Sequence, residues 1–269
     1  SILPNSLVLS ATPIPRTLNL VKTGDLELSC INELPPGRKP VETFVIDERY
    51  EKRMLSFVVK EVNKKHKVYI VCPRIDADEG DLERWSVEGI SERYGKELGN
   101  SIKLGVLHGR MTGEEKTKIL SEFESGDISV LISTTVIEVG VDVKDATLMV
   151  VLAAERFGLA QLHQLRGRVG RNDFQSYCVL LCASPLKSTI ERLKILEKTQ
   201  SGFEIAEKDL SLRGSGDKYG IRQHGIEPDL QGLDLLENDE MEKAKTFLMQ
   251  FDSESLRIDN LKEPLKTHV

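Results

Sequence analysis

Residues 130–142 read Val130-Leu131-Ile132-Ser133-Thr134-Thr135-Val136-Ile137-Glu138-Val139-Gly140-Val141-Asp142. The first four residues form an apolar run of strand length, and hydroxyl side chains follow it at once. Upstream, Thr112 and Glu115 have the spacing of a capping box, which predicts a helix with the apolar residues Ile119, Leu120 and Phe123. A helix that leads into a buried strand is the repeating unit of a parallel sheet.

The same alternation extends outward on both sides of this segment. Strand-like runs occur at Val41–Ile46, Val68–Cys72, Leu104–Leu107, Val130–Ser133, Leu148–Leu152 and Tyr177–Leu181. Between the first two, helical spacing is shown by Met54, Leu55, Val58, Val59 and Val62, with Asp47 as the expected N-cap. We therefore predict an α/β fold in which helices cover both faces of a parallel sheet.

The chain ends differ from this pattern. Leu7–Ser10 is strand-like, and we expect its partner sheet to lie upstream of this sequence. After Ser184 we predict one helix from Pro185 to about Thr199 and a second from Phe203 to about Leu212. The short link between them, Gln200-Ser201-Gly202, predicts an antiparallel hairpin.

Beyond the hairpin, the segment from Arg213 to Gly225 contains four glycines in thirteen residues, so we expect irregular structure there. The acidic tail that follows has one further helix candidate, Leu233 to Phe251.

Composition excludes several classes of protein. The chain has 269 residues, of which 39% are hydrophobic, so extensive disorder is not expected. Its longest apolar run, Leu148 to Ala154, is too short to span a bilayer. Four cysteines (Cys30, Cys72, Cys178 and Cys182) form no CxxC pair, and we expect them to be reduced. These features argue against a membrane protein, a disulfide scaffold or a zinc module, and favour a cytoplasmic protein.

Charge is distributed unevenly along the chain. The net charge is −6, from 37 basic and 43 acidic residues. Residues 226–269 contain 11 acidic and 5 basic side chains, whereas residues 153–225 contain 12 basic and 8 acidic ones. Because salt confines electrostatic fields to roughly 8 Å, an acidic chain can still have a basic zone that binds phosphates.

The strongest chemical signal is Gln164-Leu165-Arg166-Gly167-Arg168-Val169-Gly170-Arg171. If this segment is helical, Arg168 and Arg171 share a face, and two planar guanidinium groups there suit the charge of a phosphoryl group in transfer. Taken alone, the octamer also fits a solvated basic helix end.

Residues 134–142 carry a second, weaker signal. Thr134 can donate to a backbone phosphate, Gly140 allows close approach of the main chain, and Asp142 can accept from a ribose hydroxyl. A strand-to-helix turn with ordinary caps is the alternative interpretation.

Taken in order, these segments resemble the second motor domain of superfamily 2 helicases. Ser10-Ala11-Thr12 is similar to the end of their first motor domain, residues 134–142 to a motif that touches nucleic acid and nucleotide, and residues 164–171 to the arginine-finger motif. Leu34-Pro35-Pro36-Gly37-Arg38-Lys39-Pro40, Ala154-Glu155-Arg156-Phe157-Gly158-Leu159-Ala160-Gln161-Leu162-His163 and residues 202–225 together resemble the RecG family of branched-DNA helicases. This resemblance covers nearly the whole chain.

The resemblance implies a RecA-like sheet followed by a helical hairpin and a loop extension. Residues 1–24 would be a remnant of the first motor domain with the interdomain linker, and residues 25–184 the second motor domain. Residues 185–225 would form the hairpin and the translocation-motif loop, and residues 226–269 an acidic helical tail.

Roles for single residues also follow from the resemblance. Arg168 and Arg171 would contact the γ-phosphate of ATP, and Gln164 would couple nucleotide state to the interdomain contact. Gly140 and Asp142 would lie at the nucleotide, with Asp142 near the ribose.

On the DNA side, the resemblance implies that Thr134 holds a phosphate. It also implies that Arg192, Arg213 and Gln223 serve the translocation motif, in which the hairpin acts as a lever. The family pattern Arg-Gly-Pro-Gly is replaced here by Arg213-Gly214-Ser215-Gly216, which loosens the expected turn.

The sequence contains no GxxxxGK[ST] phosphate loop, and we find no acidic Mg²⁺-binding box. We expect a cut protein that lacks an amino-terminal wedge and the first motor domain, and that alone neither hydrolyses ATP nor unwinds DNA. ATP and Mg²⁺ are expected as cofactors of the full-length protein only. The expected partner is branched double-stranded DNA; we expect a monomer and no membrane association.

Two alternatives remain open at this point. A transcription-repair coupling factor shares the motor and the translocation motif, but pushes RNA polymerase. A non-enzymatic DNA-binding or regulatory module would use the arginines only to bind phosphate.

Overall fold

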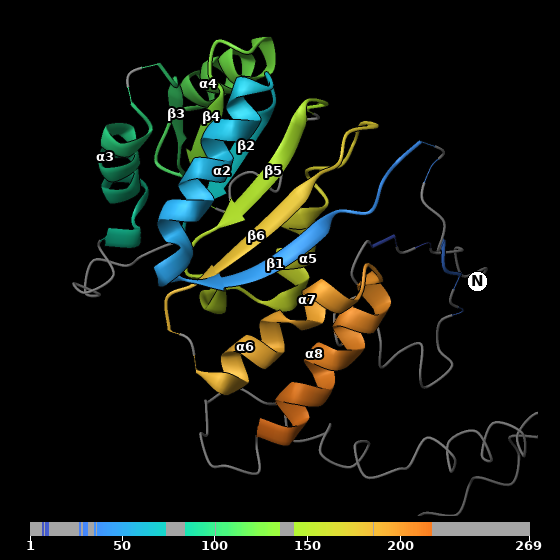
Figure 1. Cartoon of the computed structure of the whole chain (residues 1–269). Coiled ribbons are helices and arrows are strands. Elements are labelled where there is room, and N and C mark those ends of the chain that lie inside the picture. Colours follow the sequence, from blue (N-terminus) through green and yellow to red (C-terminus); the bar gives the residue numbers. More distant parts are fainter. Residues whose placement is uncertain are drawn as a thin grey trace, which may run out of the picture.

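The computed structural model describes residues 37–73, 84–99, 101–134, 143–184 and 186–216, with a few isolated residues before Gly37 (Figure 1). Six strands form one sheet in the order β1-β6-β5-β2-β4-β3, and every pair is parallel. Their bounds are β1 Glu42–Asp47, β2 Lys67–Val71, β3 Leu104–Leu107, β4 Val130–Ser133, β5 Ala146–Val151 and β6 Tyr177–Cys182. These agree with the predicted runs to within two residues, so the predicted parallel sheet is confirmed.

Helices connect β1 to β2, β2 to β3, β3 to β4 and β5 to β6, as crossover connections between parallel strands require. They are α2 (Glu51–Asn63), α3 (Val87–Leu98), α4 (Gly113–Ser125) and α5 (Leu159–Arg166), with short 3-10 turns η1 (Glu48–Tyr50) and η4 (Ala154–Arg156). Two predicted caps are confirmed: Asp47 accepts from the Arg49 N–H, and Thr112 and Glu115 form a capping box. Helix α3, capped by Ser86, was not predicted.

The core lies on both faces of the sheet, because side chains alternate along each strand. One face packs Tyr69, Val71 and Leu131 against α4, α5 and the helices that follow β6. The other packs Val68, Ile70 and Ile132 against α2 and α3. Coverage of both faces, as predicted, is confirmed.

Three helices follow β6: α6 (Lys187–Leu193), α7 (Ile195–Lys198) and α8 (Gly202–Gly216). The first predicted helix is thus divided at Lys194, and its expected first residue, Pro185, lies outside the described residues. The expectation of irregular structure from Arg213 onward is wrong for residues 213–216, which continue α8. No proline interrupts that stretch, and glycine in a helix costs only about 1 kcal/mol, so two glycines weaken a helix without ending it.

In Figure 1, α8 lies alongside α6 and α7 and beneath the sheet, so the predicted hairpin is present. Its apolar residues Leu193, Leu196 and Ile205 belong to the same core cluster as α5. The hairpin is therefore packed onto the sheet domain.

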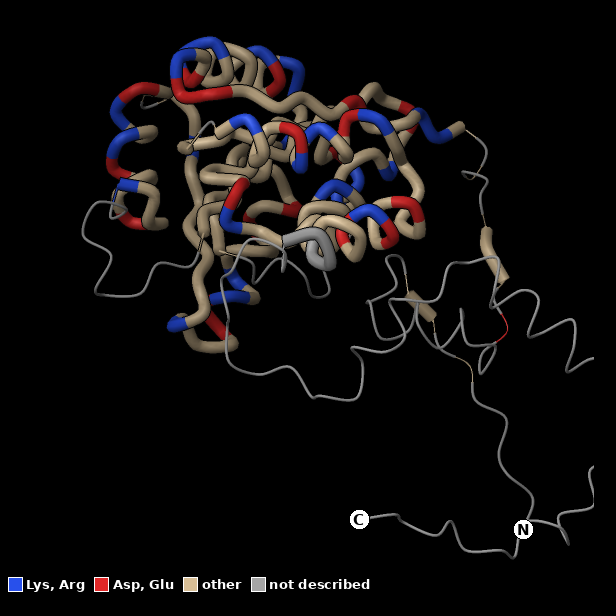
Figure 2. The backbone as a smooth tube through the Cα atoms, turned by 90° about the horizontal axis from the view of Figure 1, so that it is seen from below, with Lys and Arg blue, Asp and Glu red and all other residues tan. Residues whose placement is uncertain are grey.

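Leu7, Leu9 and Ser10 are described, but they are exposed and belong to no strand, so the expected strand is not found in them. The acidic tail and its helix candidate lie outside the described residues. In the described part of the chain, no helix combines the length and apolarity that a bilayer crossing needs. Lys and Arg are interspersed with Asp and Glu along the outer helices (Figure 2).

Candidate functional site

The sheet has two chemically different edges, because all six strands point the same way. Segments that follow the strands gather at the carboxyl edge, and segments that precede them gather at the amino edge. Ligands of open α/β sheets commonly bind at the carboxyl edge. The predicted site residues are divided between the carboxyl edge and the amino edge.

Thr134 lies at the carboxyl edge, directly after β4. Its N–H donates to the Leu107 carbonyl at the end of β3 (3.3 Å), and its side chain is half-buried. Beside it, Ser133 Oγ and His108 Nδ1 are buried atoms without a hydrogen-bond partner among the described residues. Residues with hydroxyl and imidazole side chains therefore lie at the ends of the paired strands β3 and β4.

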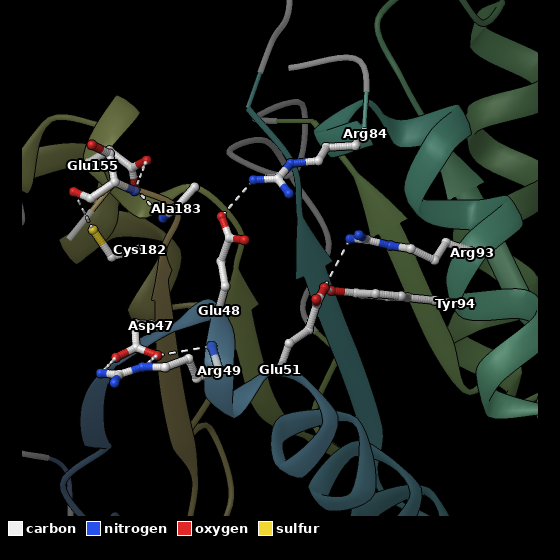
Figure 3. Close-up of polar contacts among 11 residues, drawn as sticks. Asp47, Glu48, Arg49, Glu51, Arg84, Arg93, Tyr94, Glu155, Cys182 and Ala183 are labelled. Carbon is white, nitrogen blue, oxygen red and sulfur yellow. Dashed lines mark hydrogen bonds and ion pairs between the residues drawn. The ribbon is translucent and has the colours of Figure 1, made fainter. Parts of the chain in front are cut away.

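Farther along this edge, carboxylates at the ends of β1 and β5 are paired (Figure 3). Glu48 accepts from Arg84 (2.7 Å), and Glu51 accepts from Arg93 (2.9 Å) and the Tyr94 hydroxyl (2.5 Å). Asp47 pairs with Arg49 (2.7 Å), whose hydrogen bond lowers the pKa of the carboxyl below its usual value. Asp47 is thus a cap, as predicted.

Glu155 of η4 accepts from the backbone N–H groups of Ala183 (3.1 Å) and Ser184 (3.2 Å). It therefore fixes the end of β6, from which the hairpin begins.

Arg168 and Arg171 lie at the amino edge. Gly170 packs against Val41 and Ser176, the residues just before β1 and β6, and the Asn172 amide donates to the Lys144 carbonyl before β5. Both arginines are half-buried and lie outside the packed core.

The expectation that these arginines share a helix face is wrong. Helix α5 ends at Arg166, and the chain then turns through Gly167 and Gly170. Gly170 has φ +76°, a conformation that favours glycine and stops the helix. The Arg171 Nε donates to the Gly167 carbonyl (3.3 Å), so the turn, not a helix, orients this guanidinium. Gln164 is exposed on α5.

Arg166 is the residue of this motif whose environment the sequence reasoning missed. It is 3% exposed, and its Nη1 donates to the carbonyls of Leu196 (2.8 Å) and Thr199 (3.0 Å). Burial lowers its pKa. A signal existed: on α5 the buried residues are Leu159, Leu162, Leu165 and Arg166, so Arg166 extends an apolar stripe.

Arg192 of α6 is half-buried, and it binds the main chain that leads into α5. Its Nη2 donates to the Glu155 carbonyl (2.7 Å) and its Nη1 to that of Phe157 (3.0 Å). Arg213 lies in the last turn of α8. The remaining predicted residues, Gly140, Asp142 and Gln223, lie outside the described residues.

Three of the four cysteines are buried and Cys30 is exposed; all four are free thiols. Burial raises the pKa of Cys178 to about 12 and that of Cys182 to about 11, which makes them poor nucleophiles. Within the described ranges, no group of three or more His, Cys, Asp or Glu residues could hold a metal ion.

Comparison with known proteins gives a consistent result. Residues 51–173 match the family described as "Helicase conserved C-terminal domain". The chain is 43% identical to the ATP-dependent DNA helicase RecG of Staphylococcus epidermidis over 87% of its own length and 34% of the relative's. It is 40% identical to the RecG of Streptococcus pneumoniae over 93% of its length and 38% of the relative's. The chain thus spans about a third of the curated relatives that it matches.

A solved structure of RecG bound to a three-way DNA junction is also similar. The two chains are 39% identical, with a TM-score of 0.62, over 88% of this chain and 30% of that one.

Proposed function

This chain is a RecG-type member of the helicases that share the conserved C-terminal domain, and on that premise we propose that it is the second motor domain of a helicase that remodels branched DNA. The full-length enzyme would use ATP to move along duplex DNA at stalled replication forks and Holliday junctions, in recombination and repair. The observation that carries this proposal is the similarity to RecG over nearly the whole chain.

The amino edge is the proposed nucleotide wall. Arg168 and Arg171 would place their positive charge against the γ-phosphate of ATP held by another domain. Two half-buried arginines at this edge fit an anionic group, and each planar guanidinium can donate to two phosphoryl oxygens. When ATP is bound, its hydrolysis supplies the free energy for movement.

Other residues of this wall have supporting roles in the proposal. Gln164, exposed on α5, would relay the nucleotide state to the facing domain. Gly140 and Asp142 would approach the nucleotide, with Asp142 accepting from the ribose. We assign no Mg²⁺ ligand to this chain.

The carboxyl edge is the proposed DNA wall. The Thr134 hydroxyl would donate to a backbone phosphate, a type of contact that positions a protein on a duplex irrespective of sequence. Arg192 would hold the hairpin against the segment before α5, as its two carbonyl contacts support. Arg213 and Gln223 would serve the loop that follows α8.

The phosphate loop and the Mg²⁺ box are assigned to the first motor domain, because the sequence contains no GxxxxGK[ST] motif. A wedge domain would bind the junction. We propose that the chain alone is inactive, in which case the purified chain shows no DNA-stimulated ATP turnover. Turnover free of contaminating ATPase would contradict this point.

The function is tested with the full-length protein and a synthetic three-way junction. We expect the junction to stimulate ATP hydrolysis more than a linear duplex of equal length does, and the junction to be unwound. Displacement of a stalled RNA polymerase without junction unwinding would instead support a coupling factor. Absence of both activities would refute the motor proposal.

A further inference from the structure

The arginine segment, residues 167–176, lies at the amino edge of the sheet and is fixed on both sides of β6, into which it leads. On one side, the Gln175 Nε2 donates to the Pro40 carbonyl (3.0 Å). On the other side, the Asn172 amide donates to the Lys144 carbonyl. The two acceptors precede β1 and β5, which are the neighbours of β6 in the sheet. These hydrogen bonds hold the segment to the two adjacent strands.

Phe174 carries the arginine segment one strand farther, to β2. The centroid of its ring lies 4.8 Å from that of the His66 ring, a distance typical of aromatic pairs. His66 immediately precedes β2, and β5 lies between β2 and β6. Phe174 is 50% exposed and is not among the described residues that form the two core clusters. The ring contact therefore lies outside the core, and its consequence is the position of the segment.

A buried carboxylate orients the His66 ring. The Glu61 side chain is 1% exposed, and its Oε2 lies 2.9 Å from His66 Nδ1. Burial raises the pKa of Glu61, but hydrogen bonds from His66, Lys64 and Thr147 outweigh burial and lower it, so the carboxylate is ionised at pH 7 and can only accept. The shared proton is therefore on Nδ1. This bond fixes the tautomer and the orientation of the ring.

We propose that His66, oriented by Glu61, is a positioning residue for Arg171 and acts through Phe174. This inference rests on the proposed function, in which Arg171 faces the γ-phosphate of ATP. Arg171 stands three residues before Phe174, and Asn172 Oδ1 accepts from the Phe174 N–H (3.0 Å). Because this hydrogen-bonded turn joins the two residues, displacement of the ring displaces the guanidinium.

The proposal predicts a kinetic effect that a purely structural contact would not have. An arginine that stabilises the charge of a phosphoryl group in transfer acts on the rate of the chemical step more than on substrate binding. Loss of the ring contact should therefore lower kcat and leave the KM for ATP and the affinity for DNA nearly unchanged. A contact that served only the fold would lower the melting temperature instead.

The test uses the full-length enzyme, a three-way junction and variants of both rings. Phe174→Ala removes the exposed ring, Phe174→Tyr keeps it, and His66→Ala removes its partner. Tyr50→Ala is the matched control, because Tyr50 is 48% exposed and lies in η1, which follows β1 at the carboxyl edge. For each variant, the measurements are junction-stimulated kcat, KM for ATP, junction affinity and thermal unfolding.

We expect Phe174→Ala and His66→Ala each to lower kcat by roughly 10-fold, with KM and junction affinity within about 2-fold of wild type. Because both substitutions remove the same contact, the double variant should lose no more than the larger of the two single losses. Phe174→Tyr and Tyr50→Ala should retain the wild-type kcat.

The inference is overturned if Phe174→Ala has the wild-type kcat, if Phe174→Tyr loses as much as Phe174→Ala, or if the two single losses multiply in the double variant. If His66→Ala does not fold, Phe174→Ala and Phe174→Tyr decide. Failure of the proposed function gives a different result, because the wild-type enzyme would then show no junction-stimulated turnover.

Discussion

Thr134 lies at the carboxyl edge of the parallel sheet, where the strands end, and Arg171 lies at its amino edge, where the strands begin. Thr134 follows the last residue of β4, whereas the segment around Arg171 packs on residues that precede β1, β5 and β6. A sheet built this way can meet two ligands at once, one at each edge. Mutations at the two edges should therefore have separable effects.

Replacing Thr134 with Val should weaken DNA binding by the full-length enzyme. Loss of one hydroxyl-to-phosphate hydrogen bond costs about 1 kcal/mol, or about fivefold in affinity. ATP affinity without DNA should not change, because the nucleotide wall is at the other edge. Fluorescence anisotropy with a labelled junction measures the first quantity, and equal DNA affinity in the variant would argue against Thr134 as a contact.

Gly170 should tolerate no side chain. It has φ +76°, and an added Cβ would lie 2.8 Å from Val41 Cγ2. We expect Gly170→Ala to destabilise the protein by at least about 1 kcal/mol and to displace Arg171, with loss of ATP turnover.

Gly113→Ala is the control for that measurement, because a Cβ there meets nothing within 4 Å. Thermal unfolding of both variants gives the comparison. Equal melting temperatures would show that the turn at Gly170 is not constrained.

Glu61 is a buried carboxylate that the sequence pattern did not reveal. It is bonded to Lys64 (2.6 Å), His66 (2.9 Å) and Thr147 (2.9 Å), and joins α2 to β5. Burial alone would raise its pKa, but the hydrogen bonds from these three residues outweigh burial and lower it below the usual 4.5. We expect Glu61→Ala to cost about 3 kcal/mol of unfolding free energy at pH 7.

The sign of the pH dependence follows from the lowered pKa. The ionised Glu61 stabilises the fold fully above pH 4.5, and this contribution is lost as pH falls through the lower folded-state pKa. Urea unfolding at pH 7 and at successively lower pH should show the gap between wild type and Glu61→Ala closing below pH 4.5. Lys64→Ala should lower the unfolding free energy less than Glu61→Ala does, because the Lys64 side chain is 46% exposed. A gap independent of pH would contradict the role of the ionised carboxylate.

Local signals predicted much of the fold. The runs around Ile70 and Ile132 and the capping box at Thr112 depend on neighbouring residues only, so periodicity was sufficient to find them. Strand order is different: β2 lies between β4 and β5, and nothing local to Ile70 specifies those neighbours. Helix α3 was missed although Ser86 caps it.

The same distinction applies to the site. The octamer of residues 164–171 identified the arginines, but not which of them is buried. Arg166 and Arg168 have similar sequence surroundings, but Arg166 is the last residue of α5 and binds carbonyls of the hairpin, whereas Arg168 lies in the turn that follows and is half-buried. Side chains that bind backbone carbonyls of distant elements, such as Arg166 and Arg192, leave no pairing pattern in the sequence.

ATP turnover by the full-length Arg171→Ala variant tests the central claim most directly. If Arg171 faces the γ-phosphate, DNA-stimulated turnover should fall by roughly 10³-fold or more while affinity for the junction is retained. Lys118→Ala is the control, because that side chain is 77% exposed on α4. Normal turnover, or weaker junction binding with a flatter salt dependence in place of the turnover defect, would contradict the account.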